Sequence, residues 1–547
     1  MRLDCQLLDE PTGNRLTDTF ISHFSSVTAL YDGQIPTDLD IYQSRAARLD
    51  SYFNAVHRRA LADALVDYGR RIGAPELSLA AAASLAQPQT LAVVTGQQAG
   101  LFTGPLFAVA KALTAIGVAK SMKAALGRNV VAVFWVASED HDAAEVNHAH
   151  LLGDEDEVVR ITLGTRFEPH QMVYHKPLLD AEVESVLQQV YQALPPAPHN
   201  LELIETLKST WHPNDSLATW FARLMHHLLR KHALVMLDPC LPALRQLIQP
   251  VWVHALEHHE EVASSVAKAY AEVESHGFQP EVVRDESNST LFYVEDGRRY
   301  VLERIGQNRL RARGLGLEQS VAAWVQMAKN DATAFSSNVL LRPVVQDYLL
   351  PTLAYVGGPS ELAYFPLSRG VFHAHHRDLP PLILRQRLMI VPPAVARHAS
   401  TWNVSLQDLP STRNLVSQLI AKSGGSDLER RIDHIQAEVA QMWGALATDF
   451  AVRYPQTTDI VAGHLKRSSE SAARATRKLE QLIRSHHDAS VRQLRAIERW
   501  LWTDGVQQER RLSVLNLWGQ FGATWFSELP TWGDVLVSRS PLMQLFH

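Results

Sequence analysis

The chain has little cysteine, with only Cys5 and Cys240 among its 547 residues. Two cysteines cannot build the multi-disulfide framework that stabilises many secreted proteins. The sequence also lacks any run of about 18 apolar residues, so we expect no membrane-spanning helix. Its amino terminus, MRLDCQLLDE, lacks the basic and then apolar pattern of a signal peptide. These absences predict a cytoplasmic protein without a membrane partner.

The chain also has no excess of positive charge, since its formal net charge is −6. A protein that binds nucleic acid regardless of the base sequence needs concentrated positive charge, so DNA and RNA are not expected partners. What is present is an ordinary globular composition, with 46% hydrophobic and 20% charged residues. A chain of 547 residues exceeds what one hydrophobic core usually supports, which predicts at least two structural units.

Continuous apolar runs predict a parallel α/β core. Residues 91–95 and 130–136 are apolar almost throughout, as in strands that are covered on both faces of a sheet. Residues 106–123 predict the helix between them, and Gly127 marks the turn into the second strand. The predicted fold class is therefore α/β.

Changes of pattern along the chain separate this core from insertions. A third strand is expected at 233–237, one helix over 243–275, and a closing strand at 382–391. The core is therefore discontinuous in sequence. The expected segments are 1–150 (amino-terminal helices and the first half of the core), 151–215 (first insertion), 216–275 (core), 276–338 (second insertion, a β-meander), 339–395 (core completion), 396–510 (helical arm) and 511–547 (a tail packed on the core).

A long helical stretch is expected over 458–502, where apolar residues recur at three- and four-residue steps. At ~1.5 Å per residue it would be about 65 Å long, more than the width of a typical domain. Pro455 separates it from a charged helix over 427–450. Two antiparallel helices would form a coiled-coil arm, and we expect a homodimer through it. The alternative is an intramolecular hairpin without a partner.

A glycine turn follows the first apolar strand. Gly96 precedes Gln97 and Gln98, and Gly100 and Gly104 extend the loop. Glycine permits a sharp turn and the close approach of a ligand, and the amides of the following helix favour a phosphate or carboxylate. The turn is neither a GxGxxG nor a Walker A motif. The alternative is a tight turn packed beneath the sheet.

Acidic residues and histidines follow the second apolar strand, within 138–148. Because parallel sheets bind ligands beyond the carboxyl ends of their strands, we expect this cluster to face the glycine turn. A carboxylate beside an imidazole can act in general acid–base catalysis. If residues 143–148 are helical, Glu145 shares a face with both His141 and His148. The alternatives are an acidic helix amino terminus, which leaves the histidines unexplained, and a divalent metal site.

Gly357 and Gly358 form a third turn, and Ser360 can cap the helix that follows. This turn either contacts a ligand or is only a capped turn. Cys240 follows the third strand and so could lie near the expected site, but a lone buried cysteine is usually a small apolar side chain. We assign no role to the histidine pairs at 226–227, 258–259, 375–376 and 486–487.

Three segments carry a family resemblance: VVTGQQAGLFTGPLF at 93–107, VFWVASEDHDAAEVNH at 133–148 and YVGGPSELAYF at 355–365. Together they resemble the BshC family, the cysteine-adding enzymes of bacillithiol biosynthesis, and the resemblance extends to NLWGQFG at 516–522. It implies a Rossmann-like core related to class I synthetases and nucleotidyltransferases, inserted connecting segments, and a dimerising α-helical coiled coil. The implied reaction, the last step of bacillithiol biosynthesis, joins the carboxyl group of cysteine to the amine of glucosaminyl malate.

The resemblance implies two halves of one site. The glycine loop would face a phosphate or the cysteine carboxylate, and the acidic cluster would bind the ammonium and take its proton. The cofactor is unidentified: ATP is the candidate activator, although a His-x-Gly-His turn and a Lys-Met-Ser-Lys-Ser loop are both missing, and no metal is expected. The candidate catalytic residues are Gln97, Gln98, Asp140, His141 and Asp142. The candidate substrate- or nucleotide-binding residues are Gly96, Gly100, Thr103, Gly104, Trp135, Glu139, Glu145, Asn147, His148, Gly357, Gly358, Ser360 and Glu361.

Two other classes of function fit the same residues. The cluster from Asp140 to His148 could serve a metal-dependent hydrolase or deacetylase. Alternatively, the chain could be a non-catalytic dimeric scaffold that binds a nucleotide through its glycine turns.

Overall fold

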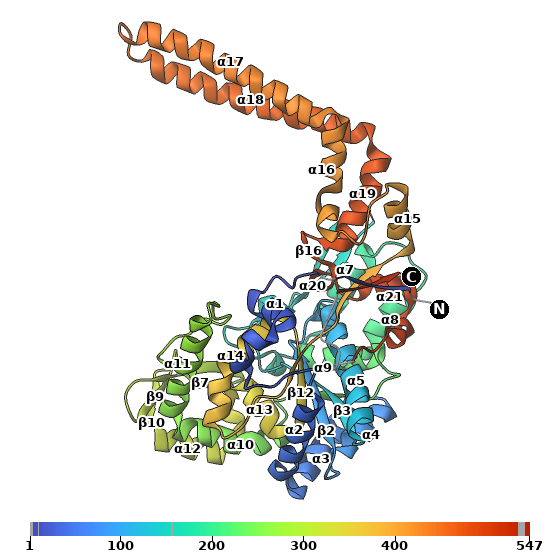
Figure 1. Ribbon diagram of the computed structural model, residues 1–547, viewed down its shortest axis with the longest axis vertical. Coiled ribbons are helices and arrows are strands. Elements are labelled where there is room, and N and C mark those ends of the chain that lie inside the picture. The colour runs from blue at the N-terminus through green and yellow to red at the C-terminus, as the bar shows by residue number, and fades with distance from the viewer. Residues whose placement is uncertain (1–3, 9, 155–156, 534–541, 547) are drawn as a thin grey trace.

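The computed structural model describes residues 4–8, 10–154, 157–533 and 542–546. At its centre lies a parallel sheet in the order β13-β12-β2-β3-β6 (Figure 1). These strands are β2 (Leu91–Gln97), β3 (Val130–Val136), β6 (Leu234–Leu237), β12 (Thr352–Gly357) and β13 (Leu382–Leu384). Their side chains are buried almost throughout, which explains the continuous apolar runs. The predicted parallel α/β core is confirmed.

The chain leaves the centre of this sheet twice, in opposite directions. From β2 it proceeds to β3 and β6 on one side, and later it occupies β12 and β13 on the other. Numbered along the chain, the order is 3-2-1-4-5, as in a Rossmann fold. The direction reverses between β2 and β12. Such a reversal opens a crevice beyond the carboxyl ends of the two strands, where ligands bind in sheets of this kind.

Helices cover both faces of the sheet. The predicted helix after the glycine turn is confirmed as α5 (Phe107–Leu126), which packs on β2 and β3 and is buried over most of its length. Helix α14 (Pro359–Ala374) follows β12 and lies on the opposite side of the sheet (Figure 1). Right-handed crossovers require this, because the chain moves in opposite directions along the sheet.

The amino-terminal region is helical, as expected, except for one strand. Its helices are α1 (Arg15–Ser22), α2 (Leu39–Tyr52), α3 (Ala55–Arg71) and α4 (Glu76–Ser84). Before them, β1 (Asp4–Leu8) pairs with β17 (Leu542–Phe546), which in turn pairs with β14 (Arg387–Val391). This small sheet joins the two ends of the chain, a pairing that no local pattern reveals.

Two insertions interrupt the core. The first holds β4 (His148–Leu152), β5 (Val158–Thr162), α7 (Asp180–Ala193) and α8 (Asn200–Thr210), followed by α9 (Leu217–Leu228). The second contains the predicted antiparallel meander, with β11 added beside β7. Its elements are β7 (Asn288–Glu295), β8 (Arg298–Arg304), β9 (Arg309–Ala312), β10 (Leu317–Ser320), α12 (Val321–Asn330) and β11 (Phe335–Ser337), and α13 (Arg342–Leu349) follows.

Two elements predicted as continuous are broken. The helix expected over 243–275 is α10 (Pro242–Glu257) and α11 (His259–Ser275), because His258 adopts the non-helical angles φ −108° and ψ 24°. The closing strand expected at 382–391 is two strands, β13 and β14, in different sheets. Between them the Arg385 backbone N–H donates to the Gly357 carbonyl, 2.8 Å away, and this contact ends the ladder.

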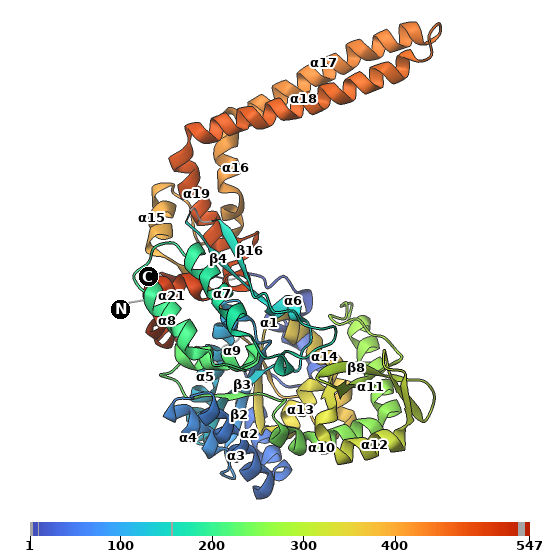
Figure 2. The same ribbon diagram turned by 180° about the vertical axis from the view of Figure 1, so that it is seen from behind.

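The predicted helical hairpin is confirmed and projects far from the core (Figures 1 and 2). It consists of α17 (Ser426–Ala451) and α18 (Thr457–His486). The single helix expected to reach residue 502 is wrong, because a break at His487 starts α19 (Asp488–Leu501). Helix α19 packs against α15 (Pro393–Thr401) and α16 (Leu415–Ile420) in a neck, so the chain bends where the hairpin leaves it.

Side chains at the base of the arm hydrogen-bond to the backbone of β14, as the backbone of a neighbouring strand would. After the short hairpin of β15 (Trp502–Thr503) and β16 (Val506–Gln507), α20 (Gln508–Arg511) returns to the core. The Gln508 amide bonds both backbone groups of Ile390, each at 2.8 Å. Glu509 accepts two hydrogen bonds from the buried Arg385 guanidinium, each 2.8 Å long.

The tail packs on the core. Trp518 of α21 (Leu515–Phe521), Trp525 and Phe526 are buried, and Gly117 of α5 leaves no room for a side chain against the Trp532 backbone. Residues 1–3, 534–541 and 547 of the predicted end segments lie outside the described residues. No helix in the described ranges is long and apolar enough to cross a membrane.

Candidate active site

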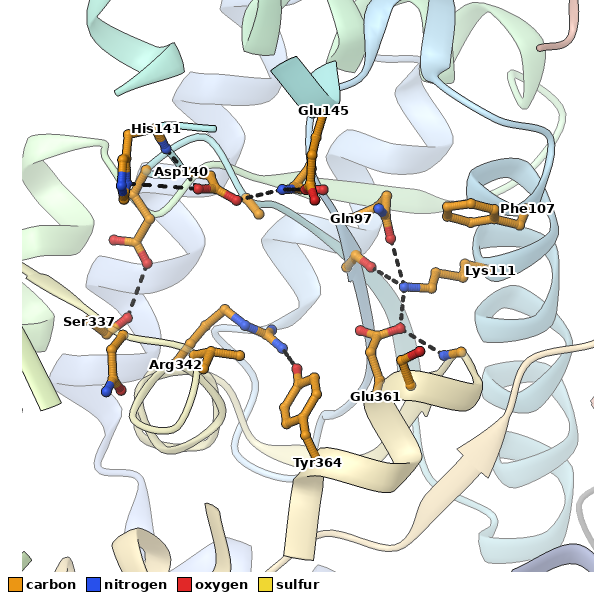
Figure 3. A pocket seen from close by; sticks show the side chains of 18 of the residues that line it. Gln97, Phe107, Lys111, Asp140, His141, Glu145, Ser337, Arg342, Glu361 and Tyr364 are labelled. Carbon is orange, nitrogen blue, oxygen red and sulfur yellow. Dashed lines mark hydrogen bonds and ion pairs between the residues drawn. The ribbon is translucent and has the colours of Figure 1, made fainter. Parts of the chain in front are cut away.

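A cavity of about 690 Å³ lies beyond the carboxyl ends of β2, β3 and β12, at the reversal of strand order (Figure 3). It brings the three predicted turns together, although they are far apart in sequence. The predicted site residues in its wall are Gly96, Gln97, Gln98, Glu139, Asp140, His141, Glu145, Gly358, Ser360 and Glu361.

The other predicted residues do not line this cavity: Gly100, Thr103, Gly104, Trp135, Asp142, Asn147, His148 and Gly357. Trp135 is fully buried inside β3. Gly100 and Gly104 pack against each other, since a Cβ on Gly100 would lie 2.7 Å from the Gly104 Cα. The alternative of a packed turn therefore describes the end of the glycine loop, while its beginning faces the cavity.

Gly96 is required by the close approach of two strands. A Cβ at this position would lie 2.9 Å from the Trp135 carbonyl oxygen. The missing side chain lets β2 pair with β3 up to its last residue, Gln97. The adjacent turn therefore leaves the sheet at a fixed point above the crevice.

Lys111 of α5 joins the two glycine turns and was missed in the sequence. Its Nζ donates to the Gly96 carbonyl at 2.7 Å and to Gln97 Oε1 at 2.9 Å, and it forms an ion pair with Glu361. Burial lowers the pKa of Lys111. Burial opposes the charge of Glu361, but Lys111 and Arg342 outweigh it and lower the pKa of Glu361. The signal was a single lysine in the apolar stretch FAVAKALTAIGV.

Gln98 links the two carboxylates at the other end of the cavity. Its Nε2 donates to Asp140 Oδ2 at 2.6 Å and to Glu145 Oε2 at 2.5 Å. Burial would raise the pKa of Asp140, but the hydrogen bond from Gln98 and the charge of Arg299 lower it. Asp140 therefore carries a negative charge at neutral pH.

His141 faces the same end of the cavity (Figure 3). Burial, followed by the charge of Arg299, lowers the pKa of its imidazole, so the ring is neutral at neutral pH. Its Nδ1 lies 3.9 Å from Asp140 Oδ1, beyond hydrogen-bond distance, and is buried without a protein partner among the described residues. In the neutral ring one of the two nitrogens carries no proton, and that nitrogen can accept one.

Residues 143–148 do not form one helix. Helix α6 spans only Ala143–Val146, and His148 begins β4, so Glu145 and His148 do not share a helix face. The Asp142 side chain accepts from the Ala144 backbone N–H and caps α6. Within the described part of the chain, no three His, Cys, Asp or Glu side chains group closely enough to hold a metal ion.

Glu139 belongs to a buried ionic cluster in the wall of the cavity. One carboxylate oxygen accepts from Arg245 at 2.8 Å and the other from the Ser337 hydroxyl at 3.1 Å. Arg299 donates to the Glu139 carbonyl and lies over the Phe292 ring, 3.9 Å from its centroid. These groups fix the backbone from which Asp140 and His141 project.

Arg342, also missed in the sequence, supplies positive charge to the opposite wall (Figure 3). It donates to the Tyr364 hydroxyl and lies 5.9 Å from the Tyr355 ring centroid. No carboxylate of the described residues lies within ion-pair distance of it. Arg342 influences the charge of Glu361 but forms no direct ion pair with it, and such a guanidinium suits an anionic ligand.

Cys240 lies below the site in a buried polar group. The Ser138 hydroxyl donates to Asp238, and its oxygen lies 3.4 Å from Cys240 Sγ. Burial raises the pKa of Cys240 to about 12, so the thiol stays protonated. A protonated thiol is a poor nucleophile, which agrees with the interpretation of a small buried side chain.

The buried carboxyl group of Asp238 should make the stability of the folded protein depend on pH. Burial raises its pKa from 3.8 to about 6, and its Oδ2 has no hydrogen-bond partner among the described residues. A raised pKa in the folded state gives stability that is full below the unfolded value and is lost as the pH rises through about 6. We therefore expect the stability of Asp238→Asn relative to the native chain to increase by about 3 kcal/mol as the pH rises from below the unfolded value to 7.

Urea unfolding of both proteins between about pH 4 and pH 7 tests this expectation, because asparagine keeps an acceptor and does not ionise. The difference in unfolding free energy should grow across that interval. An unchanged difference would show that Asp238 titrates normally.

Comparison with known proteins covers nearly the whole chain. Residues 1–386 match the family model described as "Bacillithiol biosynthesis BshC, N-terminal Rossmann-like domain", and residues 388–532 match the corresponding "C-terminal coiled-coil domain". Two relatives are named "Putative cysteine ligase BshC". The one from Heliobacterium modesticaldum is 30% identical over 93% of this chain and 94% of its own length. The one from Symbiobacterium thermophilum is 32% identical over 88% of each chain.

A solved structure from Campylobacter jejuni, named as a "putative arginyl t-RNA synthetase", is 10% identical over 85% of this chain and 99% of its own. Its TM-score is 0.24, which is too low to support an argument about the fold.

Proposed function

The chain belongs to the BshC family of bacillithiol biosynthesis, and from that premise we propose that it joins the carboxyl group of cysteine to the amine of glucosaminyl malate. One observation carries the proposal. A single cavity at the reversal of strand order holds a carboxylate-rich end and a cationic end. Amide formation needs both, because an amine must meet an activated acyl group.

The carboxylate-rich end suits the amine. The ammonium of glucosaminyl malate would bind between Asp140 and Glu145, which Gln98 already holds together. Only the free amine attacks, so one proton must leave first. His141 is the proposed acceptor, because its imidazole is neutral at neutral pH, whereas the pKa of Asp140 is lowered from 3.8 and its carboxylate binds a proton only weakly.

The cationic end suits the acyl donor. Arg342 would pair with a carboxylate or phosphate of the bound ligands. The carboxyl group of cysteine must carry a leaving group, and an acyl phosphate or adenylate made from ATP supplies one. The amine nitrogen then bonds to the acyl carbon, and the bond from carbon to the phosphate oxygen breaks with its electron pair.

The test is incubation of the pure enzyme with cysteine, glucosaminyl malate and ATP, followed by mass spectrometry. We expect the amide product together with stoichiometric AMP or ADP. Product without nucleotide consumption would remove ATP as the activator, and absence of product with every nucleoside triphosphate would overturn the ligase proposal.

We further propose that the arm forms a homodimer. Exposed apolar side chains recur along one face of α17 at seven- and four-residue steps, namely Ile435, Met442, Leu446 and Phe450, which are 42% to 65% exposed. A second copy would bury this stripe, whereas a solitary hairpin leaves it in water.

Adding charge to the stripe is expected to give a monomer. Met442→Glu combined with Phe450→Glu would bury two carboxylates in the dimer, at a cost of several kcal/mol. Ala440→Glu combined with Thr448→Glu adds the same charge at exposed positions outside the stripe and should leave the dimer intact. Size-exclusion chromatography with light scattering compares the masses. A native chain that is already monomeric at micromolar concentration would contradict the proposal.

A further inference from the structure

We propose that Lys111 is a positioning residue: it fixes the Gln97 amide so that the Gln97 NH₂ group donates a hydrogen bond to the acyl oxygen of activated cysteine. This inference rests on the proposed ligase function. It assigns opposite hydrogen-bonding roles to the two adjacent glutamines of the turn.

The orientation of Gln97 follows from the chemistry of its neighbour. An ammonium has three donors and no acceptor, so the amide atom at 2.9 Å from Lys111 Nζ must be the oxygen. The Gln97 nitrogen therefore lies on the other side of the amide, and Gln97 lines the cavity. It has no protein acceptor among the described residues, which leaves both N–H groups for a ligand.

Lys111 itself is unavailable to a ligand. Its three donors already have three acceptors: the Gly96 carbonyl, Gln97 Oε1 and the Glu361 carboxylate. The side chain is only 3% exposed, and turning toward the cavity would break its ion pair with the half-buried Glu361. Any effect of Lys111 on the reaction must therefore act through the groups that it holds.

Gln98 has the reverse orientation. Its neighbours Asp140 and Glu145 are carboxylates, which only accept hydrogen bonds when ionised, so the amide atom facing them must be the nitrogen. Gln98 thus presents its oxygen as an acceptor, while Gln97 presents a donor. Two identical residues therefore serve the two partners of an amide-forming reaction, the amine and the acyl group.

The donor of Gln97 matters most when charge develops on oxygen. As the amine bonds to the acyl carbon, the electrons of the carbonyl bond move to its oxygen, and they return when the bond to the phosphate leaving group breaks. A fixed N–H group stabilises this oxyanion and needs no reorganisation during the step. Lys111 and Glu361 supply the fixation.

Gln97→Glu tests the donor while keeping the shape and the contact with Lys111. It turns the donor facing the ligand into an acceptor, and Gln97→Met removes the donor without adding charge. We expect both variants to lower kcat by about 100-fold, the usual effect of losing an oxyanion donor, with the KM for glucosaminyl malate changed less than about threefold. Lys123→Met, at an exposed position of the same helix, is the matched control and should behave as the native enzyme.

A double-mutant cycle tests the positioning role of Lys111. We expect Lys111→Met to lower kcat by at least about 10-fold in the native background, and to add little in the Gln97→Met background, because its effect runs through Gln97. A purely structural role would give the same loss in both. If Lys111→Met does not fold, Gln97→Glu and Gln97→Met still decide the role of the donor.

Two results would overturn the inference alone. One is a native enzyme that forms the amide while both Gln97 variants keep kcat within about threefold of it. The other is an equal loss from Lys111→Met in both backgrounds. A native enzyme that forms no amide would instead overturn the proposed function, and the inference with it.

Discussion

Replacing His141 by asparagine is expected to lower kcat for amide formation by about 10²- to 10⁴-fold, the contribution of a general base. Asparagine keeps a polar side chain of similar reach but cannot accept the proton of the ammonium. The neighbouring backbone is held by Glu139 and Arg299, so the loss should come without unfolding. A scaffold that only binds nucleotide would show no change in cellular bacillithiol on this substitution, and this separates the two functions.

The pH profile identifies His141 as the source of that loss. Because its pKa is lowered below 6.5, activity should be full above that value and fall as the pH drops through the lowered pKa. His141→Asn should remove this acidic limb. The control is His170→Asn, since His170 lies beside His141 but does not line the cavity. Its positive φ of 63° suits asparagine. Loss of the limb in the control would contradict the assignment.

Replacing Glu139 by alanine is expected to lower the free energy of unfolding by about 3–5 kcal/mol, the cost of leaving a buried charge without its partner. Arg245 is buried to 98% and depends on this carboxylate for its only ion pair within the described residues. Burial opposes the charge of Arg245, but Glu139 raises the pKa of Arg245. Arginine is too basic to lose its proton in a protein, so in the variant the guanidinium stays charged without its partner.

Denaturant unfolding of three proteins measures the effect. The double variant Glu139→Met with Arg245→Met removes both charges and should recover part of the stability lost in Glu139→Ala, because no unpaired ion remains. If the single variant loses less than about 1 kcal/mol, or if the double variant loses the sum of two full penalties, the pair is not the structural support described above.

The sequence predicted the elements whose signal is local. The apolar runs of β2 and β3, the glycine turn after Gly96 and the meander of the second insertion each depend on residues close together in the chain. The rule that parallel strands present their carboxyl ends at one edge then brought Gln97, Asp140 and Glu361 to one cavity.

The sequence could not predict the features that depend on contacts between residues far apart in the chain. The break at His487 follows from packing of α19 in the neck, and the split of β13 from β14 follows from Arg385 bonding to β12 and to Glu509. Arg342 enters the site from a segment about 200 residues after His141, with no motif around it. Lys111 could be noticed in the sequence as an isolated charge in an apolar helix. The spacing of residues along the chain did not show which groups it contacts.

The fastening of α20 to β14 determines where this chain can be shortened. A chain that ends at residue 386 would contain every strand of the parallel sheet, yet it would leave the buried Arg385 without Glu509 and β1 without its partner strand β17. A deletion inside the hairpin, from α17 to α18 with a short loop, removes none of these contacts. The Rossmann-like part and the return segment after the arm therefore form one folding unit, and the hairpin is the part that can be removed.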